Sequence, residues 1–203
     1  MSQPADAGIP AIRETSMARI TTHTVDDAPA AAKPLLAEMV QFSPTGRLLN
    51  MHAQMAHAPA VLEAYVSMRR AAGRHGTLDQ RTSSALMLTA AAASGSRYAL
   101  AIIATLAARS GWRPDQIEAL LAGRPVGENK LDALTAVVRE AAADSGRVSD
   151  RAWDSAAGQG WGDEQLAEAF AYLGLTVFTA YFLNYAATEL DVPAAPARTS
   201  DGG

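Results

Sequence analysis

The stretch AFAYLGLTVFTAYFLNYAA, residues 169–187, decides the fold class of this chain because it carries no formal charge over about five helical turns. It is long enough to cross a bilayer, which takes about 20 apolar residues. Two glutamates flank it closely, however, and the Lys/Arg asymmetry that orients a membrane span is missing. A helix that is apolar on every side equally suits the centre of a helical core or an oligomer interface. We therefore predict a buried helix and no membrane partner.

Outward from this segment the same helical character continues. Ala and Leu dominate, and Gly, Pro and Ser breakers arrive at helix-length intervals. Apolar residues recur with helical spacing and no strand pattern competes with them. We expect helices over 30–41, 47–57, 59–73, 98–108, 114–121 and 131–143, with further helices beginning at Asp79, Ser149 and Asp163. The fold class predicted is all-α, a helical bundle.

The composition excludes several classes of function. The chain has 203 residues, a formal net charge of −4 and no cysteine. An acidic chain is a poor phosphate binder, so we expect no nucleic-acid partner, and without cysteine no thiol chemistry is available. Residues 1–16 are polar and do not resemble a signal peptide, so we expect a cytoplasmic protein. The expected organisation is a flexible extension over 1–16, one domain over 17–191 and a flexible tail over 192–203.

Three stretches, in order along the chain, resemble one family. They are LLNMHAQMAHAPAVLEAYVSMRRAAGRHGTLDQRT (48–82), LDALTAVVREA (131–141) and the closing segment 146–196, with its YFLNYAATELDVP sequence. The ordered series resembles the carboxymuconolactone decarboxylase and alkylhydroperoxidase-D-like superfamily. The resemblance implies an alkylhydroperoxidase-D-like bundle that forms symmetric oligomers through its long helices.

Peroxidases of that family carry a Glu, a Cys-x-x-Cys pair and a His, which relay protons to a thiolate. The resemblance places these positions, in the same order, at Ser84, Ser96, Ala99 and Ile103. In the closing motif Asn184 stands where a His is usual. These replacements imply that the chain is not a peroxidase and that a polar redox pocket has become largely apolar. We expect the five replaced positions to line a ligand pocket that holds no cofactor and no metal.

The residues that could still carry chemistry are Tyr98, Tyr181 and His52. The two tyrosines could act as hydrogen-bond donors or as a general acid, or each could be a packing aromatic whose hydroxyl meets a carbonyl. His52 and His57 lie five residues apart and do not share a helix face, which argues against a two-His metal site. Met51, Met55 and Tyr185 are expected to line the same pocket.

Two functions remain open at this stage. The first is a repurposed enzyme that holds a small hydrophobic molecule and catalyses a cyclisation, isomerisation or decarboxylation by shape and proton placement, in secondary metabolism. The second is a non-catalytic ligand-binding or assembly subunit, either a homo-oligomer or a partner of an intact homologue. The retained Tyr98, Tyr181 and His52 favour the first, whereas the loss of every proton-relay group of the family favours the second.

Overall fold

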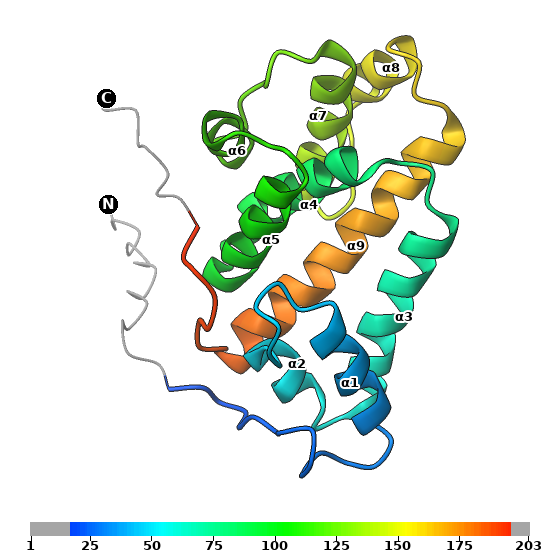
Figure 1. Ribbon diagram of the computed structural model, residues 1–203. Helices are drawn as coiled ribbons and strands as arrows, with labels where there is room; N and C mark the ends of the chain where they lie inside the picture. Colours follow the sequence, from blue (N-terminus) through cyan, green and yellow to red (C-terminus); the bar gives the residue numbers. More distant parts are fainter. Residues whose placement is uncertain (1–16, 196–203) are drawn as a thin grey trace, which may run out of the picture.

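The computed structural model describes residues 17–195, and these form nine α-helices and no strand (Figure 1). The predicted all-α class is therefore confirmed. The helices are α1 (Lys33–Gln41), α2 (Asn50–Met55), α3 (Pro59–His75), α4 (Gln80–Ser94), α5 (Arg97–Arg109), α6 (Pro114–Leu121), α7 (Asn129–Ala143), α8 (Asp150–Gly158) and α9 (Asp163–Ala186). The predicted extension over 1–16 lies outside the described residues, as do residues 196–203.

The helix starts follow from local chemistry. The side chains of Asp79, Ser96 and Ser149 each accept a hydrogen bond from the backbone N–H three residues later, which satisfies one orphan donor of α4, α5 and α8. The last helix begins at Asp163, as predicted, but this residue is not the N-cap. Gly162 is the N-cap, and Asp163 stands in the first turn, where its carboxylate favours the positive end of the helix dipole.

Helix α9 is the centre of the bundle. Figure 1 shows it crossing the molecule, with α3 along one side, α4 and α5 along the other, α1 and α2 at one end and α6 to α8 at the opposite end. It contacts α3, α4, α5 and α7. By length and composition α9 could span a membrane, and half of its most apolar stretch is buried inside the fold. One face of α9 is thus buried, as predicted for residues 169–187, whereas Phe170, Tyr181 and Tyr185 on another face are exposed.

The chain after α9 packs back onto the domain. Val192 is 7 % exposed and belongs to the main core, and Ala195 packs against that core. The boundary predicted for the tail, residue 192, is therefore placed too early in the chain. The apolar Val192 and Ala195 still pack against the core formed by the helices. Asp191 bonds two elements here: its carboxylate accepts from the Tyr98 hydroxyl at 2.5 Å and from the Asn50 backbone N–H at 2.8 Å. These contacts fix the start of α2.

Candidate functional site

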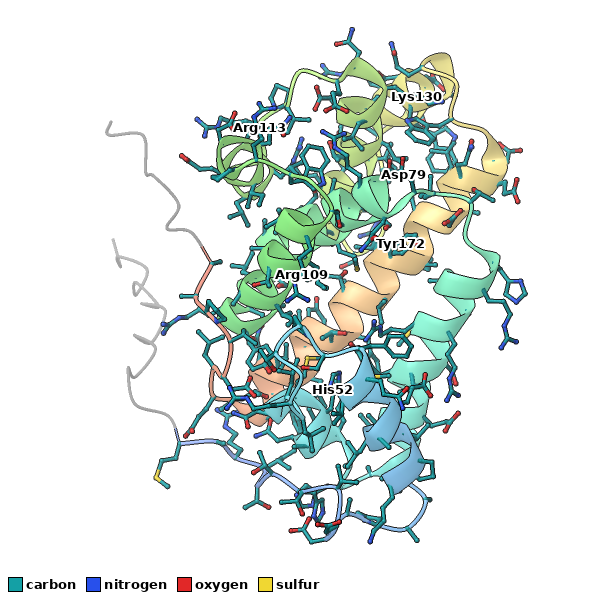
Figure 2. All side chains as sticks on the ribbon, viewed as in Figure 1. His52, Asp79, Arg109, Arg113, Lys130 and Tyr172 are labelled. Carbon is teal, nitrogen blue, oxygen red and sulfur yellow. The ribbon has the colours of Figure 1, made fainter. Side chains whose placement is uncertain are left out.

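A cavity of about 310 Å³ lies among α2, α3, α4, α5 and α9, next to the loop that follows α1. In Figure 2, His52 and Tyr172 lie at two levels along α9, with His52 toward the end of the bundle that carries α1 and α2. The walls are mainly apolar. The lining residues are Phe42, Ser43, Pro44, Leu49, Met51, His52, Tyr65, Arg69, Ala72, Gly73, Gln80, Ser83, Met87, Ile102, Ile103, Leu106, Tyr172, Leu175, Thr176 and Thr179.

His52 is the buried polar group of this cavity. Its side chain is 3 % exposed, and neither ring nitrogen has a hydrogen-bond partner within residues 17–195. The nearest aromatic neighbour is Tyr65, whose ring centroid lies 5.3 Å from that of the imidazole. Burial, and secondly the positive charge of Arg69, lower the pKa of His52 to about 3. At neutral pH the ring is therefore uncharged, with one N–H donor and one free acceptor.

Two threonine hydroxyls of the cavity already have partners. Thr176 donates to the Tyr172 carbonyl at 2.8 Å, and Thr179 donates to the Leu175 carbonyl at 2.7 Å. Burial, followed by the negative charge of Glu168, raises the pKa of Tyr172, so this phenol stays protonated at neutral pH. Among the lining residues, His52 is the one with buried side-chain polar atoms that lack a hydrogen-bond partner within residues 17–195, and the cavity also contains one cation.

That cation is Arg69, which is the one charged residue among those that line the cavity. It is half-buried, its Nη1 lies 3.8 Å from the Met39 sulfur, and its guanidinium carbon lies 5.8 Å from the Tyr65 ring centroid. Within residues 17–195 no carboxylate forms an ion pair with it. The positive charge of Arg69 contributes to the lowered pKa of Glu38, but the Glu38 carboxylate is hydrogen-bonded to the neighbouring Arg70.

The structure brings three of the predicted residues to the cavity, namely Met51, His52 and Ile103. Ser84 and Ser96 do not line the cavity; each instead forms hydrogen bonds within or next to its own helix. Ser84 donates to the Arg81 carbonyl and accepts from the Trp112 indole N–H at 3.2 Å, and Ser96 caps α5. Ala99 and Met55 are completely buried in the main core, where their side chains pack between helices.

Tyr98 also lies apart from the cavity lining. Its hydroxyl is bonded to Asp191, and burial, together with that carboxylate, raises the pKa of the phenol well above its ordinary value. Such a phenol is a poor proton donor, since burial and the neighbouring charge both oppose its ionisation. The prediction of a catalytic Tyr98 is replaced by a structural role, which is the packing alternative stated above.

Three predicted residues of α9 face outward. Tyr181 is 63 % exposed and Tyr185 is 71 % exposed, and the exposed Asn184 amide lies 3.4 Å from the Ser94 carbonyl oxygen. The reason is helical phase. With 100° per residue, Thr176 and Thr179 point into the bundle, which turns positions 181, 184 and 185 away from the cavity. We correct their assignment from pocket residues to surface residues.

The sequence reading missed the cavity residues of α3. Tyr65, Arg69, Ala72 and Gly73 are spaced by four, three and one residues and form one stripe of that helix. The one feature that could have indicated a cavity here is Arg69, a charged residue within this stripe. From the sequence alone, Arg69 cannot be distinguished from the exposed Arg70 that follows it.

Comparison with known proteins supports the family resemblance. Residues 59–141, from α3 to α7, match the Carboxymuconolactone decarboxylase family. This match and the similarity of the fold to alkylhydroperoxidase-D-like structures support the resemblance to the carboxymuconolactone decarboxylase and alkylhydroperoxidase-D-like superfamily. The chain has no cysteine and therefore lacks the cysteine pair of the peroxidases in that superfamily. No curated protein matches the sequence.

Solved structures share the fold at low sequence identity. The alkylhydroperoxidase core of a peroxidase-related protein from Ralstonia eutropha JMP134 is similar at a TM-score of 0.76 and 13% identity, covering 87% of this chain and 94% of its own. A peroxidase-related protein from Silicibacter sp. TM1040 reaches 0.71 at 13% identity, covering 89% and 95%. The debrominase Bmp8, in complex with 2,3,4-tribromopyrrole, reaches 0.73 at 16% identity, covering 85% and 91%.

Proposed function

We propose that this chain is a non-redox enzyme that encloses a small, largely apolar molecule in the cavity and acts on it through the neutral imidazole of His52. The reaction class is a cyclisation, isomerisation or decarboxylation, and a place in secondary metabolism fits a repurposed family member. The observation that carries the proposal is the unpaired His52. A buried polar group without a hydrogen-bond partner lowers the stability of the folded state by about 1–3 kcal/mol. Such unfavourable groups cluster at functional sites, where a bound ligand can supply the missing partner.

The chemistry available to His52 follows from its neutral state. Its N–H can donate a hydrogen bond to a ligand oxygen on which negative charge develops, as in an enolate, without carrying a charge of its own into the apolar cavity. The surrounding wall, which includes Ile102, Ile103 and Leu106, excludes water and so strengthens that bond. The wall also holds a flexible ligand in a fixed shape, which lowers the entropic part of the barrier.

Two further facts support an enzyme of this kind. The debrominase neighbour was solved with 2,3,4-tribromopyrrole, so this fold can enclose a small ring compound. The chain has no cysteine, and we therefore place its chemistry outside the thiol reactions of the peroxidases.

A second candidate is a non-catalytic ligand-binding or assembly subunit, and the exposed face of α9 favours it. Phe170, Tyr181 and Tyr185 are each more than 60% exposed and fall within about 60° of one another around the helix. Large exposed aromatics on one helix face are typical of an interface. The face suits a homo-oligomer or a hetero-assembly with an intact homologue.

Native mass spectrometry on protein from its own host, beside a denatured control, separates the two candidates. We expect a discrete adduct that is released on denaturation, and turnover of that compound or of its precursor by the purified chain. His52→Gln should reduce turnover about 100-fold, the size typical of one lost oxyanion donor. The matched control is His75→Gln at the exposed end of α3, which should keep the wild-type rate.

A wild-type rate in His52→Gln would remove His52 from the mechanism. An empty chain that assembles with a cysteine-bearing homologue, and turns over nothing, would establish the subunit in place of the enzyme.

A further inference from the structure

We propose that the ligand of this cavity is a monocarboxylate with an apolar body, which places its carboxylate on Arg69 and a neighbouring polar atom on His52. The proposal rests on the ligand-binding cavity proposed above and adds the chemical class of the ligand. Neither residue stands at a position that the resemblance assigns to the Glu, the cysteine pair or the His of the peroxidases.

The first observation is the unpaired charge of Arg69. Consecutive arginines on α3 differ in their surroundings. Arg70 is hydrogen-bonded to Glu38, and its Nη1 lies 3.9 Å from Glu63 Oε1. Within residues 17–195 the guanidinium of Arg69 has one hydrogen-bond partner, the weak acceptor Met39 Sδ. A guanidinium presents a planar fork of N–H donors that fits a carboxylate in two parallel hydrogen bonds. At Arg69 most of this fork is still available.

The second observation is the relative placement of Arg69 and His52. Both lie beside the Tyr65 ring, with the guanidinium carbon 5.8 Å from its centroid and the imidazole centroid 5.3 Å from it. Both residues line the same cavity, and the charge of Arg69 acts on the imidazole, so a ligand beside the Tyr65 ring has both groups nearby. Because the imidazole is neutral and its nitrogens are unpaired, it can hydrogen-bond an uncharged oxygen or nitrogen of the ligand.

The third observation limits the charge of the ligand. No acidic side chain lines the cavity, and Arg69 is its one cation. A single negative charge is matched by Arg69, whereas a second one would be buried among apolar side chains without a partner. A monocarboxylate therefore fits the site better than a dianionic phosphate ester or a dicarboxylate does.

The test uses matched probes of one shape, namely 3-phenylpropanoate, 3-phenylpropanamide and phenethyl phosphate, with affinities measured by isothermal titration calorimetry on the full chain. We expect the carboxylate to bind about tenfold tighter than the amide or more, the factor that one charge-assisted hydrogen bond provides. Arg69→Gln should remove this preference, and Arg69→Lys should keep part of it. Arg74→Gln, at the exposed end of the same helix, is the matched control and should leave the preference unchanged.

The outcomes separate the two proposals. An amide that binds as tightly as the acid, or a preference that survives in Arg69→Gln, overturns carboxylate recognition and leaves an apolar binding cavity in place. Tighter binding of the phosphate ester overturns the single-charge assignment. If none of the three probes binds, the proposed ligand class is overturned together with the binding cavity of the proposed function. Thermal unfolding of each variant, beside wild type, shows that a lost preference comes from a folded protein.

Discussion

Two buried polar groups, the Tyr98 hydroxyl beside the start of α2 and the His52 imidazole within α2, differ in one respect. Tyr98, on the α5 side, donates to Asp191, and the same carboxylate also accepts the Asn50 N–H. His52, two residues further along α2, is equally buried but has no hydrogen-bond partner within residues 17–195. The first group holds three parts of the chain together. The second holds no other segment by a hydrogen bond, and we propose that a ligand accounts for its burial. Two equally buried polar side chains can therefore differ in whether the fold itself satisfies their hydrogen bonds.

The largest effect is expected from Asp191→Ala. This change leaves both the Tyr98 hydroxyl and the Asn50 N–H without their acceptor, so the free energy of unfolding should fall by about 3 kcal/mol. Urea unfolding followed by circular dichroism measures it. Asp154→Ala, on the exposed surface of α8, is the control and should change stability by less than about 0.5 kcal/mol. We call the Asp191 carboxylate with its two donors, the Tyr98 hydroxyl and the Asn50 N–H, the Asp191 clamp. An equally small effect at Asp191 would mean that this clamp does not stabilise the fold.

The second prediction concerns acid. The pKa of His52 falls from its ordinary 6.5 to about 3 in the folded chain, so between these pH values the unfolded chain binds a proton that the folded chain does not. Stability is therefore unaffected by this group above about pH 6.5 and decreases as the pH falls through that window. At pH 5 the loss amounts to about 2 kcal/mol.

His52→Leu isolates this contribution, because the variant lacks the titrating ring while other groups titrate as before. The difference in unfolding free energy between variant and wild type should grow as the pH is lowered from 7 to 5. A difference that stays constant with pH would show that the folded state accepts a proton at His52 as readily as the unfolded chain.

A smaller effect is expected from Tyr98→Phe. The variant loses one hydrogen bond to a carboxylate while keeping the aromatic ring, so stability should fall by about 1.5 kcal/mol. Ligand binding in the cavity should be unchanged, because the hydroxyl serves the clamp. Tyr181→Phe is the matched control on the exposed face of α9 and should be neutral. Lost turnover in a fully folded Tyr98→Phe would restore the catalytic role first predicted for this residue.

The smallest effect has the opposite sign. At neutral pH, His52→Leu should stabilise the protein by about 1 kcal/mol, because an apolar side chain replaces a buried imidazole without partners. His57→Leu provides the contrast, since the His57 ring is bonded to Thr21 and its loss should lower the melting temperature. Destabilisation by His52→Leu would mean that the imidazole has partners in solution, and the comparison between the two groups would then fail.

The sequence by itself determined the all-α class, most helix boundaries and the family resemblance. These depend on local properties: breakers, capping side chains such as Asp79 and Ser149, and the 3.6-residue period of apolar positions are all readable along one chain. Likewise the absence of cysteine alone excluded thiol chemistry. His52, Met51 and Ile103 were chosen because each lies in a stretch that resembles the family; all three line the cavity, and their roles stay predictions.

The tertiary structure alone decided which polar groups are satisfied. The Asp191 carboxylate meets Tyr98 and Asn50 across sequence separations of 93 and 141 residues, so no local pattern could have assigned Tyr98 to a clamp. The phase of α9 against its neighbours turned Tyr181 to the surface, because a helix that is apolar on every side does not reveal which face is buried. Arg69 became a candidate ligand contact for a similar reason: ion pairing depends on which side chains the packed helices bring together, and within residues 17–195 no carboxylate forms an ion pair with Arg69.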